Sequence, residues 1–153
     1  MPAVAAATAI SPSPKVKILD AFGNFVPDAT NAVSVALQGG TSGAVLSGST
    51  NVPAISGVAT FAELKVDKSG AGYSLRANSS GLVSVQSSSF DVSIGAPATV
   101  AFKVQPRLST VNTTLSPAIE VEVRDAGGNL VAAATPVTLA LGNNPSAASL
   151  TGT

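Results

Sequence analysis

A strict alternation of apolar and charged residues runs through Ile119-Glu120-Val121-Glu122-Val123-Arg124, and Asp125-Ala126-Gly127-Gly128-Asn129 follows it directly. A period of two residues is typical of a half-buried β-strand, because neighbouring side chains on a strand point to opposite faces. An Asp side chain caps backbone N–H groups, and Gly and Asn tolerate positive φ, so the second part predicts a tight turn. The sequence therefore predicts a strand that ends in an Asp-x-x-Gly-Asn turn.

The same strand and turn occur once earlier in the chain. Residues 15–18 alternate in the same way, and Asp20-Ala21-Phe22-Gly23-Asn24 lies 105 residues before its copy. At an offset of 104, Val33, Val35 and Leu37 match Val137, Leu139 and Leu141. A period of about 100 residues fits a complete β-sandwich domain better than a solenoid repeat.

This period divides the chain into a first unit, residues 1–95, and a second unit, residues 96–153. Residues 97–106 form the predicted first strand of the second unit, with Val100, Phe102 and Val104 as its apolar positions. The matching strand of the first unit would precede residue 1, so we expect the first unit to lack its first strand and the second to contain only its N-terminal half. The linker Gly95-Ala96-Pro97-Ala98 is short, and Pro97 stiffens it.

The remaining segments predict an all-β fold. Short alternating or apolar runs at 33–37, 59–61, 73–77, 82–85, 90–94 and 137–141 are separated by Gly, Asn, Asp, Pro and Ser about every ten residues. No amphipathic helix is predicted. The expected core of the first unit is the set Val16, Ile18, Val33, Val35, Leu37, Phe61, Leu64, Tyr73, Leu75, Phe90 and Val92.

Composition narrows the possible functions. The chain has no Cys and no His, only 10% charged residues and a formal net charge of zero. These values exclude thiolate and imidazole chemistry and give no basic surface for nucleic acid. We therefore expect no enzyme and no cofactor. No stretch has the roughly 20 apolar residues of a membrane-spanning helix, and we expect any export signal to lie outside this chain.

The two Asp-x-x-Gly-Asn motifs admit two interpretations. One is a structural turn at Asp20, Gly23 and Asn24, repeated at Asp125, Gly128 and Asn129. The other is a calcium site formed by Asp20, Asn24 and Asp28, because calcium prefers oxygen ligands. Calcium needs six to eight oxygens, and few carboxylates lie near this motif, so we favour the turn and expect no metal.

Tyr73, the only tyrosine, follows Asp67 at the spacing of a tyrosine corner. In that motif the ring is buried and the hydroxyl bonds to nearby backbone. A catalytic tyrosine is the alternative, but no base partner is evident. On the alternating strands, Glu120 and Glu122 occupy the positions that Lys15 and Lys17 hold in the first unit. We expect these to form solvated strand faces, and their opposite charges would limit pairing between identical units or favour contact between different ones.

Together these motifs resemble the bacterial immunoglobulin-like domains that occur in tandem in invasin- and intimin-type surface proteins. The resemblance rests on the order of the Asp-x-x-Gly-Asn turn, Leu46-Ser47-Gly48-Ser49, Gly57-Val58-Ala59-Thr60-Phe61, Leu64, Gly70-x-Gly72-Tyr73-x-Leu75-x-Ala77 and Phe90–Ile94. It implies an immunoglobulin-like antiparallel β-sandwich with a structural or adhesive stalk role, outside the cell or on its surface. It also implies that neighbouring repeats are the partners, and that a host or carbohydrate ligand would bind through other domains.

Two alternatives remain open. The first is an extracellular filament subunit that completes its sandwich by strand exchange with identical subunits, with 97–106 as the donated strand. The second is a carbohydrate- or receptor-binding module. Such sites usually expose aromatic residues, and Phe22 and Phe25 are the expected exposed pair.

Overall fold

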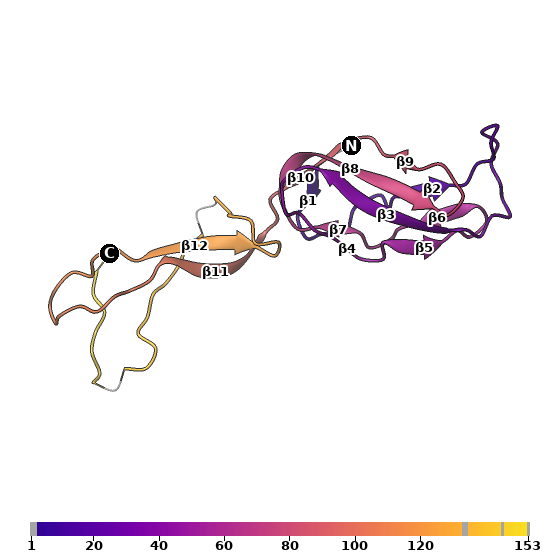
Figure 1. Cartoon of the computed structure of the whole chain (residues 1–153). Coiled ribbons are helices and arrows are strands. Elements are labelled where there is room, and N and C mark those ends of the chain that lie inside the picture. The colour runs from indigo at the N-terminus through magenta and orange to yellow at the C-terminus, as the bar shows by residue number, and fades with distance from the viewer. Residues whose placement is uncertain (1–2, 133–134, 145, 153) are drawn as a thin grey trace.

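The computed structural model describes residues 3–132, 135–144 and 146–152, so residues 1–2 of the first predicted unit and residues 133–134, 145 and 153 of the second lie outside the description. The described residues form an all-β fold with no helix. Figure 1 shows a body built from the first unit, and a second unit that extends away from it.

The larger sheet of the first unit contains most of its long strands. Its order is β1 (Val4–Ala5), β10 (Phe90–Ser93), β8 (Gly70–Ser79), β3 (Ala32–Gly39) and β5 (Asn51–Pro53), and β9 (Val85–Gln86) also pairs with β8. β1 runs parallel to β10, and the other pairs are antiparallel. The longest pairing joins β3 to β8 from Val33↔Ser79 to Gly39↔Tyr73.

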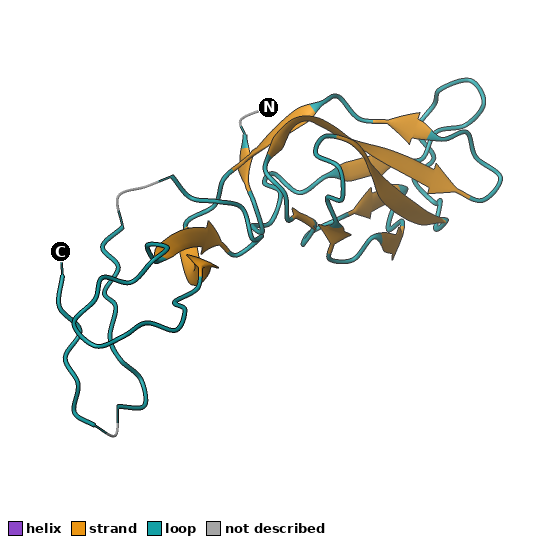
Figure 2. Ribbon diagram, turned by 60° about the vertical axis from the view of Figure 1, so that its left-hand side comes forward, coloured by secondary structure: helices purple, strands orange, loops and turns teal. Residues whose placement is uncertain are grey.

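Two smaller sheets lie opposite this large sheet (Figure 2). One pairs β2 (Lys15–Lys17) with β6 (Val58–Thr60), and the other pairs β4 (Leu46–Ser47) with β7 (Lys65–Val66). A single cluster of buried apolar side chains draws on both layers, as expected when each sheet buries one face. The arrangement is consistent with a β-sandwich.

The predicted core residues are buried or packed against the core. Phe61, Leu64 and Tyr73 have no exposed surface, and only Val16 and Leu37 are partly exposed. Sequence reasoning overlooked Val66 and several small or N-terminal core residues, namely Ala6, Ile10, Ala54, Ala59 and Ala77. Small residues carry a weak pattern signal, although a packed interior needs them to bring the sheets together.

The second unit contains one hairpin-like pair, β11 (Pro97–Val104) antiparallel to β12 (Glu120–Asp125). The strand predicted at 137–141 does not form, and that prediction was wrong. Val137, Leu139 and Leu141 are 41–46% exposed. Their counterparts in the first unit lie on β3, which pairs with β5 and β8. Among the described residues, no strand pairs with 137–141.

A second correction concerns the strand predicted at 82–85. The structure begins that strand at Val85, and Leu82 and Val83 lie in the preceding loop. Val83 is 97% exposed. The apolar run at 82–85 therefore predicted the start of β9 three residues too early. Its first two residues, Leu82 and Val83, are exposed loop residues.

Candidate functional site

The two Asp-x-x-Gly-Asn motifs fold into the same turn. In the first, Asp20 Oδ1 accepts the N–H groups of Phe22 at 2.9 Å and Asn24 at 2.8 Å, and Asn24 Nδ2 donates to Asp20 Oδ2 at 3.0 Å. In the second, the corresponding bonds from Gly127, Asn129 and the Asn129 amide to Asp125 measure 2.9, 2.8 and 2.9 Å. The carboxylate thus organises both turns from within.

The surroundings of the two turns differ. Asp20 is exposed, whereas Asp125 is 1% exposed and its Oδ2 accepts the N–H of Gly95 at 2.8 Å. Asn129 Nδ2 donates to the carbonyl of Asp67 at 2.7 Å, and the Ser69 N–H donates to Asn129 Oδ1 at 3.0 Å. The turn of the second unit is therefore bound to the first unit.

Lys68 also contributes to the contact between the two units. Its Nζ donates to the carbonyl of Gly127 at 3.1 Å. We call the contact the junction and define it by the residues that form its bonds: Asp67, Lys68, Ser69, Gly95, Asp125, Gly127 and Asn129. Three of its bonds join residues about 60 positions apart in sequence, so it holds the second unit to segment 67–69 of the first unit in addition to the linker residue Gly95.

Gly127 is central to the junction for a steric reason. A Cβ atom at this position would lie 2.0 Å from the carbonyl oxygen of Asp67. The first turn has Phe22 at the matching position, and its side chain is 91% exposed. The one residue that differs between the two turns at this site therefore allows the second turn, but not the first, to approach a neighbouring backbone this closely.

Asp20 and Asn24, two of the three residues of the alternative calcium site, hydrogen-bond to each other. Among the described residues, no group of three or more His, Cys, Asp or Glu side chains comes together. Asp20 instead accepts hydrogen bonds from Phe22 and Asn24, as described above, and Asp28 is exposed. The hydrogen bond from the Asn24 side chain is the main cause that lowers the pKa of Asp20, with backbone N–H groups adding to it.

The charge on Asp125 is also stabilised by its neighbours. Burial pushes the pKa of Asp125 upward, but hydrogen bonds from the Asn129 side chain and from the N–H groups of Gly95, Asn129 and Gly127 outweigh it and hold this pKa below its ordinary value of 3.8. A carboxylate with a lowered pKa stabilises the folded arrangement above its ordinary pKa and loses that effect as the pH falls through the lowered value.

The junction is therefore expected to weaken on acidification below pH 3.8. The amide signals of Gly95 and Ser69, followed by NMR during a pH titration, should report this change. Asp125→Asn should remove this pH dependence, because it removes the titrating group. Asp20→Asn is the matched control, since its turn does not contact the other unit, and it should leave the titration of Gly95 unchanged. A titration that survives in Asp125→Asn would contradict the assignment.

Tyr73 lies in the core with its hydroxyl directed at the loop after β3. The hydroxyl donates to the carbonyl of Lys68 at 2.9 Å and accepts the N–H of Thr41 at 3.1 Å. Gly40 adopts φ +68°, and a Cβ there would lie 2.0–2.4 Å from the tyrosine ring. These contacts tie the loop to the same segment, 67–69, that forms the junction.

Tyr73→Phe is expected to destabilise the first unit by about 1–2 kcal/mol, because the Thr41 N–H and the Lys68 carbonyl both lose a partner in a partly buried place. Chemical denaturation of both proteins measures the difference. An unchanged midpoint with an unchanged slope would show that the hydroxyl contributes nothing to stability.

Two ion pairs lie on the strands of the second unit. Lys103 lies 2.6 Å from Glu120, and Arg124 pairs with Glu122. The hydrogen bond and charge of Glu120 raise the pKa of Lys103. Lys15 and Lys17 take the places of the two glutamates in the first unit, and among the described residues neither pairs with a carboxylate.

The predicted donated strand and the expected aromatic pair can also be located. Val100, Phe102 and Val104 belong to β11, which pairs with β12 of its own unit. Phe22 and Phe25 are 91% and 45% exposed, which confirms that they form an exposed pair. Phe22 belongs to the first turn and Phe25 follows it directly.

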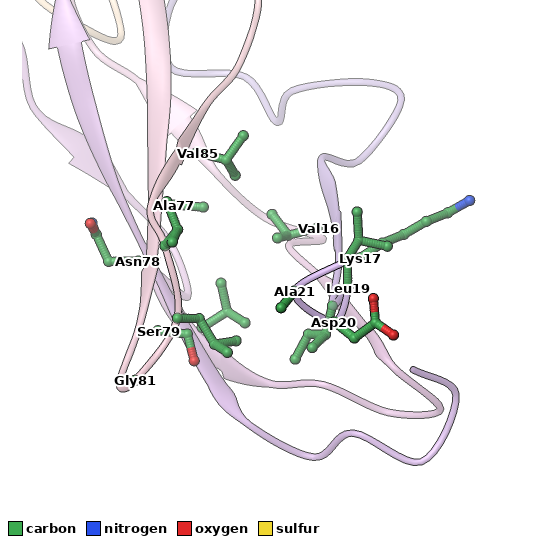
Figure 3. Close-up of a pocket in the computed structure, with 14 residues that line it drawn as sticks. Val16, Lys17, Leu19, Asp20, Ala21, Ala77, Asn78, Ser79, Gly81 and Val85 are labelled. Carbon is green, nitrogen blue, oxygen red and sulfur yellow. The ribbon is translucent and has the colours of Figure 1, made fainter. Parts of the chain in front are cut away.

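A groove of about 410 Å³ lies beside β2. Figure 3 shows Val16, Leu19 and Ala21 on one side of it and Ala77 and Val85 on the other. Its lining also includes Ile18, Val33, Leu82 and Val83, so it is mostly apolar. Sequence reasoning missed both this groove and the junction surface at 67–69, since neither has a motif of its own.

None of the described segments is a helix with the length and apolar character needed to cross a bilayer. Comparison with models of protein families and with curated protein sequences found no match for this chain.

Proposed function

We propose that the chain is a structural module from a bacterial surface or secreted protein, made of immunoglobulin-like sandwich repeats that act as a spacer. The observation that carries this proposal is the junction, in which the side chains of Lys68, Asp125 and Asn129 make four hydrogen bonds across the two units. A freely jointed pair of domains needs no such contact. A spacer does, because it transmits position along its length only if adjacent repeats keep a fixed orientation.

The arrangement of the strands at the ends of the first unit supports the same role. The chain enters this unit at β1 and leaves it after β10, and these strands run parallel with Val4 opposite Val92. Pulling on the two ends would therefore slide the strands along each other and load the contacts between them together. Those contacts include the bond from the Ala6 N–H to the Ser93 carbonyl at 2.8 Å.

The sequence properties agree with a role that needs no reactive group. The chain has no Cys and no His, and backbone groups engage the Tyr73 hydroxyl, so it offers no thiolate and no imidazole and its one phenol is already hydrogen-bonded.

Single-molecule pulling from both ends of the chain tests the proposal. We expect one cooperative unfolding event for the first unit, with a released length of about 3.3–3.6 Å per residue. Ala6→Pro removes the N–H that binds Ser93 and should lower the unfolding force. If the parent chain extended gradually, with no separate unfolding event for the first unit, the proposed mechanical role would be contradicted.

A further inference from the structure

Segment 67–69 holds the second unit, yet it belongs to neither of the strands that flank it. The pairing of β7 with β4 ends at Val66, and the pairing of β8 with β10 begins at Gly70. A strand ladder fixes the backbone of the residues that it pairs. The carbonyl and N–H groups of segment 67–69 must therefore be held in place by other contacts.

The loop between β3 and β4, residues 40–45, supplies contacts of this kind through Thr41. Thr41 Oγ1 donates to the carbonyl of Ser69 at 2.7 Å. The Thr41 N–H donates to the Tyr73 hydroxyl at 3.1 Å, and this hydroxyl donates to the carbonyl of Lys68 at 2.9 Å. Thr41 is thus bonded directly to one residue of the segment and through Tyr73 to the next.

The other end of the same loop binds the segment through Asp67. The Val45 N–H donates to Asp67 Oδ1 at 2.7 Å, and the Asp67 N–H donates to the carbonyl of Val45 at 3.3 Å. The carbonyl of Asp67 accepts the second unit's Asn129 Nδ2 at 2.7 Å. The carboxylate and N–H of Asp67 therefore hold the loop, and its carbonyl holds the second unit.

Lys68 and Ser69 divide their polar groups in the same way. The Lys68 carbonyl accepts the Tyr73 hydroxyl, and Lys68 Nζ donates to Gly127. The Ser69 carbonyl accepts Thr41, and the Ser69 N–H donates to the second turn. Three consecutive residues each join the loop or Tyr73 on one side to the second unit on the other. A surface held in this way is ordered before its partner docks, which lowers the cost of docking.

We propose that Thr41 and Asp67 are positioning residues of the junction. Their side chains hold segment 67–69 in the geometry that binds the second turn, although within the described part of the chain both side chains bond only to the first unit. The loop at 40–45 thereby sets the orientation of the second unit. This inference rests on the spacer role proposed above, because it concerns how a fixed orientation between units is maintained.

Spin labels on one strand of each unit of the full chain test the proposal. Ala36→Cys lies on β3 and Thr99→Cys on β11, both at exposed positions, so neither label is carried by the loop under test. Pulsed electron resonance then measures the distribution of distances between the units. We expect one narrow distribution for the parent sequence.

Two variants remove only the loop's hold on the segment. Thr41→Val removes the hydroxyl and keeps the shape of the side chain, and Asp67→Ala removes the acceptor of the Val45 N–H and keeps the carbonyl that binds Asn129. We expect both variants to broaden the distance distribution. The Ser69 amide should exchange about fivefold faster in each, the effect of one lost hydrogen bond of ordinary strength.

Two matched substitutions control for the change of residue. Thr41→Ser keeps the hydroxyl and should keep the narrow distribution. Thr60→Val makes the same change as Thr41→Val at an exposed position of β6 and should also leave the distribution narrow. Thr41 is exposed as well, so its variants are expected to fold like the parent.

The outcomes separate this inference from the spacer role. A distribution that stays narrow in both Thr41→Val and Asp67→Ala would overturn the positioning role and leave the spacer role intact. Broadening by Thr41→Ser or Thr60→Val would also overturn it, because the effect would then not depend on the Thr41 hydroxyl. A broad distribution in the parent would refute the spacer role and this inference together, since there would be no fixed orientation to maintain.

Discussion

Phe61→Ala is expected to lower the free energy of unfolding of the first unit by about 3–5 kcal/mol. The ring has no exposed surface, and it lies in the apolar cluster shared by both layers. Removing it costs the transfer energy of the ring and leaves a cavity that stiff neighbouring strands fill only in part. Since small domains have total stabilities of about 5–15 kcal/mol, this loss is a large fraction of the total. Chemical denaturation followed by circular dichroism measures it.

Phe22→Ala is the matched control for this prediction. Phe22 is 91% exposed, so the same change of residue should alter stability by no more than about 0.5 kcal/mol. If Phe61→Ala leaves no folded protein, Phe61→Leu provides a milder change with the same expected direction. Equal effects of the two Phe→Ala variants would mean that the described core is not the one that stabilises the protein.

Gly127→Ala is expected to release the second unit from the first. The added Cβ would lie 2.0 Å from the Asp67 carbonyl oxygen, and both groups are close to rigid backbone. The turn must therefore move away, and the bonds of Asn129 to Asp67 and Ser69 and of Lys68 to Gly127 are lost. At about 1 kcal/mol for each bond, the contact loses about 3 kcal/mol.

Amide hydrogen exchange of Ser69 is the direct readout, because its N–H donates to Asn129. We expect its protection to fall in Gly127→Ala, while the amides of β3 and β8 keep theirs. Gly142→Ala is the control, since a Cβ there meets nothing within 4 Å. Unchanged protection of Ser69 in Gly127→Ala would show that the junction does not depend on this close approach.

Much of the fold was predictable because local pattern and long-range packing agree in the first unit. The alternation at 15–18 and the apolar runs at 33–37, 73–77 and 90–94 match strands β2, β3, β8 and β10, except that Ile18 and Ile94 lie just beyond the strand ends. Each of these strands has a partner, and its apolar side faces the core. The same pattern failed at 137–141, where the sequence is equally strand-like and no partner is present. A strand is stabilised by its neighbours, so its own sequence is not sufficient.

The site was predictable only in part. The turn residues Asp20, Gly23 and Asn24 and their copies are recognisable, because each is needed for local backbone geometry. Only the second turn contacts the other unit. This difference depends on the residue at one matching position, which is Gly127 in the second turn and Phe22 in the first, and on the surface at 67–69. That surface lies about 60 residues away in sequence, and it carries no repeat signal. A contact between two segments that are far apart in sequence can be recognised only in the folded structure.

The most direct test of a fixed junction is a distance distribution between the two units. Because the chain has no cysteine, spin labels can be placed at Ser49→Cys and Thr99→Cys, both of which are exposed positions. Pulsed electron resonance should give one narrow distribution for the parent sequence and a broad one when Gly127→Ala is added. A distribution that is already broad without Gly127→Ala, with the same width in both proteins, would contradict the account of the chain as a rigid spacer.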